Sequence, residues 1–390
     1  MKAVVWKGRR KVKVERVKDP VIREPTDAIV RVTATAICGS DLHLYGKIVP
    51  GMVKGDIMGH EPVGIVEEVG AAVRHIRRGD RVVVPFNVAC GQCYFCERGL
   101  QSQCETTQNR RFRKGGSLLG YTHLYGGIPG GQAEYLRVPQ AHYGPIPIRT
   151  NAPDARLALL ADVLPTAWQA VEYAGIGDLD SLVIWGLGPI GQACARIALH
   201  RGVSRVIGVE KVPERLAMAA RHGVETIDVT TIKKPQKAVM ELTQGRGADA
   251  VIDAVGYEAS GSAADSLLQT TKLQPDKLHA LISCLASVRR GGTVSISGVY
   301  LGWMPMLHIG DLFDRQITIR MGQGNVRRWS DQILPLISDG DQLGVDDIVT
   351  HVLPLEAAPN AYKMFQKKQE GVVKVVLQPG KNGEARRNAN

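Results

Sequence analysis

Two patterns of hydrophobic and polar positions divide the chain. In the first part, up to about residue 148, apolar and polar residues alternate in short runs, of which the clearest cover 28–36, 63–69, 81–84 and 133–138. Alternation with a period of two is typical of strands that bury one face, and turn residues at close intervals separate these runs. The pattern predicts a mainly antiparallel, β-rich unit.

After Asn151-Ala152-Pro153 the pattern becomes helical, with apolar residues at helical spacing from Asp154. From Ser181, short apolar runs alternate with helices that begin at Pro189 and Pro213; the predicted strands cover 182–185, 206–209, 250–255, 293–297 and 317–319. Strands that alternate with helices are typical of a doubly wound parallel sheet. The segment 349–377 again has strand, helix and strand, which is consistent with a return to the first domain.

A chain of 390 residues exceeds what one hydrophobic core usually organises, so two domains are expected. We predict an α/β protein with a β-rich domain over 1–163, a doubly wound parallel-sheet domain over 164–320 and a return to the first domain over 321–390. A further hypothesis is that the connection 256–291, with a helix over 276–288, covers part of the cofactor crevice.

A net charge of +11 could attract a polyanionic partner such as nucleic acid. The basic residues gather in 7–18, where they alternate with valines, and in 110–114, beside two glycines. Aromatic residues for base stacking are not interleaved with them, so we expect solvated faces and no nucleic-acid partner. The charged start of the chain does not read as a signal peptide, and glycines and polar residues interrupt 181–200, the most apolar stretch. We expect a cytoplasmic protein without a membrane partner.

The strongest local motif is the run C-x2-C-x2-C-x7-C formed by Cys90, Cys93, Cys96 and Cys104, with glycines at 91 and 99. In a reducing compartment, closely spaced cysteines more often bind metal than form disulfides. Four thiolates suit a closed, tetrahedral structural zinc site. Iron–sulfur ligation is an alternative, although the last gap is long and the surroundings are polar. Cys194 and Cys284 lack such spacing and are interpreted as packing residues.

Two strings in the β-rich part combine zinc-ligand types with proton-carrying groups. Cys38-Gly39-Ser40-Asp41-Leu42-His43 and Gly59-His60-Glu61-Pro62-Val63-Gly64 together offer a thiol, imidazoles, a hydroxyl and carboxylates. Such groups can ligate a metal and move a proton. Each residue alone also suits a buried packing role.

A glycine motif follows the first strand of the predicted parallel sheet. Gly186-Leu187-Gly188-Pro189-Ile190-Gly191 opens an apolar helix, and Glu210 closes the next strand. In this context the glycines permit a tight turn and close approach of a pyrophosphate, and Pro189 and Ile190 open the helix whose N-terminus attracts phosphate. An acid at the position of Glu210 accepts hydrogen bonds from the ribose and favours NAD. Arg215 nearby keeps NADP open, since it suits a 2′-phosphate. Asp253 is expected near the crevice, supporting the fold.

These motifs, in this order and over nearly the whole chain, resemble those of zinc-dependent alcohol dehydrogenases of the medium-chain dehydrogenase/reductase superfamily. The resemblance implies a GroES-like catalytic domain, a Rossmann domain and two zinc ions per chain. It implies that Cys38 and His60 ligate the catalytic zinc and that Glu61 approaches the metal when water or substrate leaves. It also implies a dimer or tetramer.

The resemblance assigns further roles around this metal. Ser40 and His43 resemble the hydroxyl-to-imidazole proton relay of the family. Asp41 is expected to buttress a ligand, because metal-bound histidines commonly donate their second N–H to a carboxylate.

Asp162 stands where many of these enzymes have a cysteine as third ligand. The string Asp162-Val163-Leu164-Pro165-Thr166 resembles that of glutathione-independent formaldehyde dehydrogenases and aldehyde-dismutating enzymes. A carboxylate is a legitimate zinc ligand and makes the site harder. The alternative is an N-cap or first-turn carboxylate of the next helix.

The sequence predicts NAD-dependent oxidation of a small alcohol or hydrated aldehyde, formaldehyde being the most specific suggestion. Three alternatives stay open: an aldehyde dismutase with tightly held NAD, a dehydrogenase of polyols or secondary alcohols, and a non-catalytic dinucleotide-binding protein.

Overall fold

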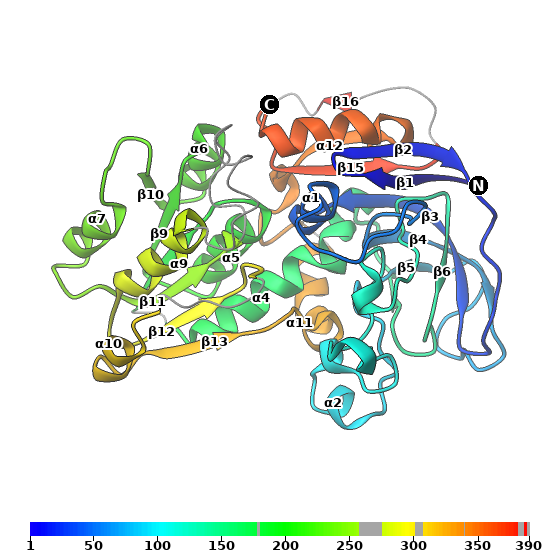
Figure 1. Ribbon diagram of the computed structural model, residues 1–390, viewed down its shortest axis with the longest axis horizontal. Coiled ribbons are helices and arrows are strands. Elements are labelled where there is room, and N and C mark those ends of the chain that lie inside the picture. The colour runs from blue at the N-terminus through cyan, green and yellow to red at the C-terminus, as the bar shows by residue number, and fades with distance from the viewer. Residues whose placement is uncertain (178–179, 257–274, 301–306, 339, 381–385, 388–390) are drawn as a thin grey trace. The chain divides into compact units, whose positions relative to one another are not determined.

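The computed structural model describes residues 1–177, 180–256, 275–300, 307–338, 340–380 and 386–387 (Figure 1). The chain forms two compact units. Unit 1 comprises Met1–Pro165 and Gly324–Asn390, and unit 2 comprises Thr166–Gln323. The C-terminal segment is therefore part of the same unit as the N-terminal one. Among the described residues, no helix has both the length and the apolar character that a membrane crossing requires.

Unit 1 is built on an eight-stranded sheet in the order β16-β14-β15-β3-β4-β5-β7, with β6 paired to β3, beside a two-stranded sheet of β1 and β2. Its strands are β1 Lys2–Gly8, β2 Lys11–Arg16, β3 Ala28–Ile37, β4 Glu61–Val69, β5 Arg81–Val83, β6 Tyr135–Val138, β7 Ile146–Pro147, β14 Val349–Pro354, β15 Lys374–Gln378 and β16 Arg386–Arg387. Most neighbours are antiparallel, whereas β14 and β15 are parallel. The antiparallel, β-rich character predicted for this part is confirmed.

The helices of unit 1 are short apart from those near its C-terminus. They are α1 Gly39–Tyr45, α2 Tyr94–Glu97, η1 Gln101–Gln103, η2 Arg110–Phe112, η3 His123–Tyr125, α3 Asp154–Leu157, η4 Ala158–Ala161, α11 Val326–Ser338, η6 Asp346–Ile348, η7 Leu355–Ala357 and α12 Ala358–Lys367. Valines of β3, β4 and β5 form a buried core with Leu119 and Leu136. This core holds the ends of the central strands in place.

Unit 2 is a six-stranded parallel sheet in the order β10-β9-β8-β11-β12-β13. Its elements are α4 Val163–Ala174, which begins in unit 1, β8 Ser181–Trp185, α5 Pro189–His200, β9 Arg205–Glu210, α6 Pro213–Arg221, β10 Glu225–Asp228, α7 Pro235–Leu242, β11 Ala248–Asp253, α9 Pro275–Ser287, β12 Val288–Ile296, α10 Ile309–Asp314 and β13 Thr318–Met321. The order reverses at β8, as in a doubly wound Rossmann sheet. The predicted fold class is confirmed.

Helices pack against the sheet of unit 2: α5 contacts β8 and β9, and α9 contacts β11 (Figure 1). The central strands are buried along nearly their whole length, as is usual when helices cover a parallel sheet. Several strand predictions were imprecise: β11 covers Ala248–Asp253 and not 250–255, β6 begins two residues later than expected, and β10 was not predicted. β12 begins at Val288, before the expected 293, and its register with β11 shifts between Val288 and Thr293. β13 begins one residue later than expected. Half of the connection 256–291, residues 257–274, lies outside the described residues, so its covering role stays a hypothesis.

Candidate active site and metal centres

Strand register in unit 1 gathers one group of ionisable residues. β3 ends at Ile37, directly before Cys38, and β4 begins at Glu61, directly after His60. Ala36 pairs with Glu61, and Ile37 pairs with Val375 of β15. Because these strand ends lie side by side, residues far apart in sequence meet at one edge of the sheet.

Asp162 joins this group from a break between two helices. It follows η4 and precedes α4, and its backbone is not helical, with φ −152° and ψ −62°. The break is held by a hydrogen bond from the amide of Phe86 to the carbonyl of Ala161, 3.3 Å long. The carboxylate of Asp162 lies 3.4 Å from Cys38 Sγ and 3.3 Å from His60 Nε2.

The ligand atoms of Cys38, His60, Glu61 and Asp162 all lie within 4.8 Å of one another, and all four residues are buried. We call these four residues the mixed cluster. A thiol, an imidazole and carboxylates that converge away from water fit a zinc ion by donor chemistry. The structure thus brings together the three expected ligands and the neighbouring acid.

Asp41 lies beneath the imidazole of the mixed cluster. Its Oδ1 is 3.3 Å from His60 Nδ1, and its Oδ2 accepts hydrogen bonds from the amide of Cys38 at 3.0 Å and from Gln132 Nε2 at 3.1 Å. Tyr362 in turn donates to Gln132 Oε1 at 2.8 Å. A buried carboxylate held in this way fixes the ring so that Nε2 faces Asp162.

Neighbouring acidic groups change the pKa of His60. Burial alone lowers the pKa of His60, but the charge of Asp41 and hydrogen bonds with Asp162, Asp41 and Cys38 outweigh burial and raise the pKa well above its ordinary value. The neighbouring carboxylates therefore favour a positive charge at the imidazole of His60. Gln132 and Tyr362 were missed by sequence reasoning, because no local pattern marks a supporting amide or phenol.

Ser40 and His43 lie on α1, three positions apart and so on neighbouring turns of one face. Ser40 Oγ is 3.3 Å from His60 Nε2, which places the hydroxyl at the mixed cluster. His43 is buried in the last turn of α1. The two groups expected for a proton relay therefore start at the cluster and continue along one helix.

A buried ion pair adjoins the mixed cluster. Lys374 Nζ lies 2.6 Å from Glu61 Oε1, and both side chains are fully buried. Burial alone lowers the pKa of Lys374, but the charge of Glu61, followed by those of Cys38 and Asp162, raises it, so the ammonium stays charged. Sequence reasoning missed Lys374. The available signal was a single lysine inside the apolar run 372–377.

Aromatic side chains border the mixed cluster. The ring of Phe86 meets the ring of His60 edge-on, with centroids 6.0 Å apart. The segment after it is held close: the amide of Leu119 donates to the carbonyl of Phe86, and Gly120 lies so near Gly59 that a Cβ would be 2.2 Å from the Gly59 carbonyl. Tyr121 follows directly, and burial raises the pKa of its phenol.

The second cluster contains the four closely spaced cysteines. The Sγ atoms of Cys90, Cys93, Cys96 and Cys104 lie within 4.8 Å of one another. Gly91 and Gly99 have φ of +80° and +71°, and a Cβ at Gly91 would lie 2.3 Å from the ring of Tyr143. Glycine at these positions lets the backbone curl around the sulfurs. We call this group the cysteine cluster.

Backbone donors already point at the cysteine cluster. The amide of Cys90 donates to Cys104 Sγ at 3.4 Å, and the amide of Glu105 donates to Cys93 Sγ at 3.4 Å. A hydrogen bond from Cys96, with help from the amide of Cys90, lowers the pKa of Cys104 to about 4 despite burial. Thiolates stabilised in this way suit zinc. All seven cysteines of the chain are free thiols, and Cys194 and Cys284 are buried in unit 2.

The glycine motif of unit 2 forms the turn between β8 and α5. Gly186 has φ +86°, and a Cβ there would lie 2.9 Å from Val255. A Cβ at Gly191 would lie 1.9 Å from the Gly186 carbonyl, so the helix packs directly on the turn. Gly188 precedes Pro189, the first residue of α5, and Ile190 follows it. The N-terminus of a helix after such a turn attracts phosphate.

Glu210 holds this turn. Its Oε2 accepts a hydrogen bond from the amide of Leu187 at 3.0 Å, and its Oε1 accepts from the amides of Lys211 at 2.7 Å and Val212 at 3.2 Å. Arg215 Nη1 is 3.6 Å from Glu210 Oε2, and both side chains are buried. Oε1 already accepts two hydrogen bonds, whereas Oε2 accepts one from an amide and can accept a further donor.

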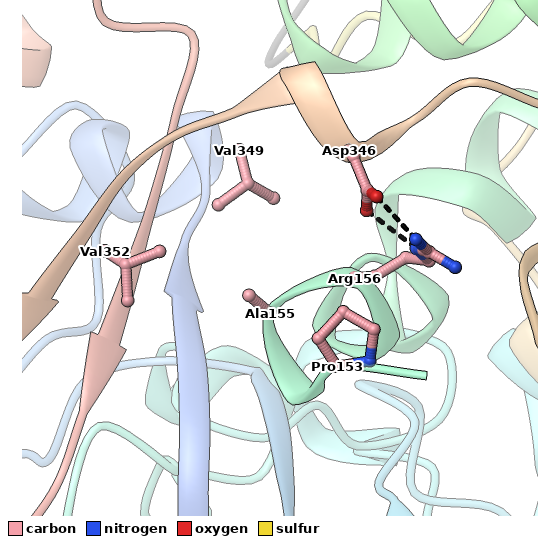
Figure 2. A pocket seen from close by; sticks show the side chains of 6 residues that line it. All are labelled: Pro153, Ala155, Arg156, Asp346, Val349 and Val352. Carbon is pink, nitrogen blue, oxygen red and sulfur yellow. Dashed lines mark hydrogen bonds and ion pairs between the residues drawn. The ribbon is translucent and has the colours of Figure 1, made fainter. Parts of the chain in front are cut away.

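A separate hollow of unit 1 is not the candidate active site. Figure 2 shows that it is lined by Pro153, Ala155, Arg156, Asp346, Val349 and Val352. Arg156 binds Asp346 through two contacts of 2.7 and 2.5 Å, so the two charges neutralise each other. Among the described residues that line it, none belongs to either cysteine-containing cluster.

Comparison with known families agrees with both units. Residues 24–148 match the family described as "Alcohol dehydrogenase GroES-like domain", and residues 189–272 match "Zinc-binding dehydrogenase". The chain is 41% identical to the zinc-type alcohol dehydrogenase-like protein AdhB of Bacillus subtilis, over 97% of this chain and 100% of that protein. It is 32% identical to the glutathione-independent formaldehyde dehydrogenase of Pseudomonas aeruginosa, over 93% and 94% respectively.

The fold agrees with a solved structure as well. The alcohol dehydrogenase TADH of Thermus sp. ATN1 superposes with a TM-score of 0.82 at 34% identity, over 97% of this chain and all of that one. Family matches in both units, relatives at more than 30% identity along nearly the whole length, and the shared fold lead to one conclusion. The chain belongs to the zinc-dependent alcohol dehydrogenases of the medium-chain dehydrogenase/reductase superfamily.

Proposed function

We propose that this protein oxidises a small alcohol or a hydrated aldehyde, with formaldehyde as the most specific candidate, and passes the hydride to NAD. The observation that carries the proposal is the convergence of Cys38, His60 and Asp162 beside Glu61 in one buried cluster. Cys38, His60 and Asp162 would hold the catalytic zinc, and Cys90, Cys93, Cys96 and Cys104 the structural one.

When bound, a zinc ion with three protein ligands supplies Lewis-acid chemistry, which lowers the pKa of a substrate hydroxyl toward neutrality. Residues around the ligands would orient them for this chemistry. Asp41 holds the imidazole of His60 in orientation, and the Glu61–Lys374 pair keeps a second carboxylate beside the ligands. Ser40 would take the substrate proton and pass it toward His43, which follows on the same face of α1.

Asp162 is the residue that points to the substrate class. A carboxylate in place of a thiolate leaves a harder and more Lewis-acidic metal site, which suits oxygen-rich ligands such as an aldehyde hydrate. The same D-x-L-P-T string is the basis of the resemblance to formaldehyde dehydrogenases, and the enzyme of that name from Pseudomonas aeruginosa is among the relatives. The harder metal site and the shared string favour formaldehyde over larger alcohols.

Glu210 supports NAD as the cofactor. Its carboxylate lies against the glycine turn, and Oε2 retains the capacity to accept a hydrogen bond from a ribose hydroxyl. A 2′-phosphate would bring negative charge to this carboxylate. Arg215 at 3.6 Å from Glu210 is already engaged in an ion pair, which weakens it as a phosphate ligand.

The test is a substrate screen with NAD and with NADP, followed by the absorbance of the reduced nicotinamide, together with zinc analysis of the same preparation. We expect two zinc ions per chain and reduction of NAD by formaldehyde or a short primary alcohol. Equal amounts of alcohol and acid without net NADH would replace the proposal by dismutation. A full zinc complement with cofactor binding but no turnover of any substrate would indicate a non-catalytic dinucleotide-binding protein.

A further inference from the structure

One buried acid of unit 2 takes no part in the chemistry described so far. Asp253 ends β11 and is fully buried. Its Oδ1 accepts hydrogen bonds from the amides of Val255 at 2.9 Å and Gly256 at 3.5 Å. Its Oδ2 accepts a hydrogen bond of 2.6 Å from the hydroxyl of Tyr300. Both oxygens of the carboxylate are thus used by donors of the chain.

These contacts connect the loops that follow two neighbouring strands. Val255 and Gly256 follow β11, and Tyr300 lies beyond the end of β12. The carbonyl of Asp253 also accepts the amides of Ser297 at 3.0 Å and Gly298 at 2.9 Å. The two loops touch, since a Cβ at Gly298 would lie 2.4 Å from the amide nitrogen of Gly256. Asp253 is therefore the junction between them, through both its backbone and its side chain.

This junction lies at the carboxyl ends of β11 and β12, where a doubly wound sheet binds its cofactor. In a doubly wound sheet the dinucleotide lies across the carboxyl ends of the strands, with its two halves on either side of the point where the order reverses. Glu210, at the end of β9, marks the adenosine side. The strand order β10-β9-β8-β11-β12-β13 then places the nicotinamide half over the ends of β11 and β12, where Asp253 and Tyr300 lie.

We infer that the hydrogen bond between Asp253 and Tyr300 is a positioning device for the nicotinamide half of the cofactor. It holds residues 297–300 after β12 against residues 254–256 after β11, so that this part of the surface beneath the ring is already formed before the cofactor arrives. The inference rests on the proposed use of NAD. Neither residue needs to touch the reacting atoms for this role.

The hydrogen bond is strong enough to matter. Burial raises the pKa of Asp253, while the donors Tyr300, Val255 and Gly256 oppose that rise. A hydroxyl that donates to a buried carboxylate makes a charge-assisted bond, and its removal leaves a carboxylate oxygen without that donor. Residues 297–300 after β12 would then lose this side-chain hydrogen bond and keep the backbone hydrogen bonds to Asp253.

The test compares the binding of NADH and of AMP to the whole protein by fluorescence titration. For Tyr300→Phe we expect the dissociation constant of NADH to rise about tenfold, because a hydrogen bond to a charged group is lost. The dissociation constant of AMP, which carries only the adenosine half, should be unchanged. A general loss of folding would weaken both ligands, so the difference between them isolates the positioning role.

Two further variants complete the comparison. Asp253→Asn should bind NADH within about threefold of the parent protein, because the amide oxygen can accept the backbone donors while the amide nitrogen donates to the Tyr300 oxygen. Tyr173→Phe is the matched control, since this tyrosine of unit 2 stacks under Arg320 and the exchange keeps its ring. It should leave both dissociation constants unchanged.

The failures are distinguishable. If the parent protein binds NADH but Tyr300→Phe binds it equally well, or loses NADH and AMP affinity in equal measure, the positioning role is overturned and the proposed function stands. If the parent protein binds neither NADH nor AMP, the proposed cofactor is wrong and this inference fails with it.

Discussion

The two cysteine-containing clusters of unit 1 are assembled in opposite ways. The cysteine cluster comes from one continuous stretch, 90–104, whose glycines allow the chain to fold on itself. The mixed cluster draws Cys38, His60, Glu61 and Asp162 from three separate segments, and Lys374 adds a fourth. The first depends on local spacing, whereas the second depends on strand register.

The groups that surround the two clusters also differ, being local backbone in one case and distant side chains in the other. Backbone amides donate to the sulfurs of the cysteine cluster, so the chain itself closes that site. Around the mixed cluster, the supporting hydrogen bonds and the ion pair come from side chains of other elements, namely Asp41, Gln132, Tyr362 and Lys374. A site closed by its own backbone suits a structural role, and a site supported by side chains suits reactivity. This comparison makes four predictions.

The largest effect is expected for Asp162→Ala. Loss of this ligand should lower kcat/KM by roughly a thousandfold, equivalent to about 4 kcal/mol of lost transition-state stabilisation. Zinc analysis should find one ion per chain instead of two, because the cysteine cluster is separate. Asp162→Cys, which offers a thiolate at the same position, should retain both ions. If Asp162→Ala keeps two zinc ions and normal turnover, Asp162 is no ligand.

Lys374→Met should lower the free energy of unfolding by about 3 kcal/mol, because it leaves Glu61 buried without its cation. Denaturant unfolding measures this change. The double variant Glu61→Leu with Lys374→Met removes both charges and should recover most of the lost stability. A single variant as stable as the parent protein would show that the pair does not hold the mixed cluster together.

Cys104→Ser should remove the zinc of the cysteine cluster and lower the free energy of unfolding by roughly 2–3 kcal/mol. The kcat of the protein that remains folded should stay within a factor of two or so, because the cysteine cluster does no chemistry. Cys194→Ala, a buried cysteine of unit 2, is the control and should keep two zinc ions. A large fall in kcat without loss of stability would contradict the division between the clusters.

The smallest effect is expected for Asp249 of unit 2, which contacts Ser181 and Arg289 and belongs to neither candidate metal site. Asp249 accepts hydrogen bonds from the amide and hydroxyl of Ser181 at 2.8 and 2.7 Å and from Arg289 at 2.5 Å. Burial raises the pKa of Asp249, but these donors outweigh burial and hold the pKa below its usual value of 3.8. The stabilisation is present above that value and is lost as the pH falls through the lower folded-state pKa.

Asp249→Asn should therefore cost less than about 1 kcal/mol near neutral pH, since the ion pair is partly exposed and screened by solvent. The difference from the parent protein should shrink as the pH falls below about 4. Thermal unfolding at several pH values measures this difference in stability. A parallel series with a chelator removes the contribution of bound metal. A difference that grows toward low pH would reverse the assigned sign.

Sequence reasoning worked where a pattern is local. The alternation in β3 and β4, the strand–turn–helix at Gly186 and the cysteine spacing each carry their meaning within a few residues, and the elements were placed accordingly. It was weaker at β12, where two glycines and two arginines interrupt the apolar pattern of a strand that the sheet nonetheless continues through. It missed Gln132, Tyr362 and Lys374, whose partners are distant in sequence.

By itself, the sequence determined the two types of domain, the cysteine cluster and the glycine turn, because spacing and periodicity act over short distances along the chain. Only the tertiary structure decided that Lys374 lies against Glu61, that Gln132 lies against Asp41, and that Asp253 joins the residues after β11 to those after β12. Such contacts follow from strand register, and register is set by the packing of whole sheets and not by any short segment.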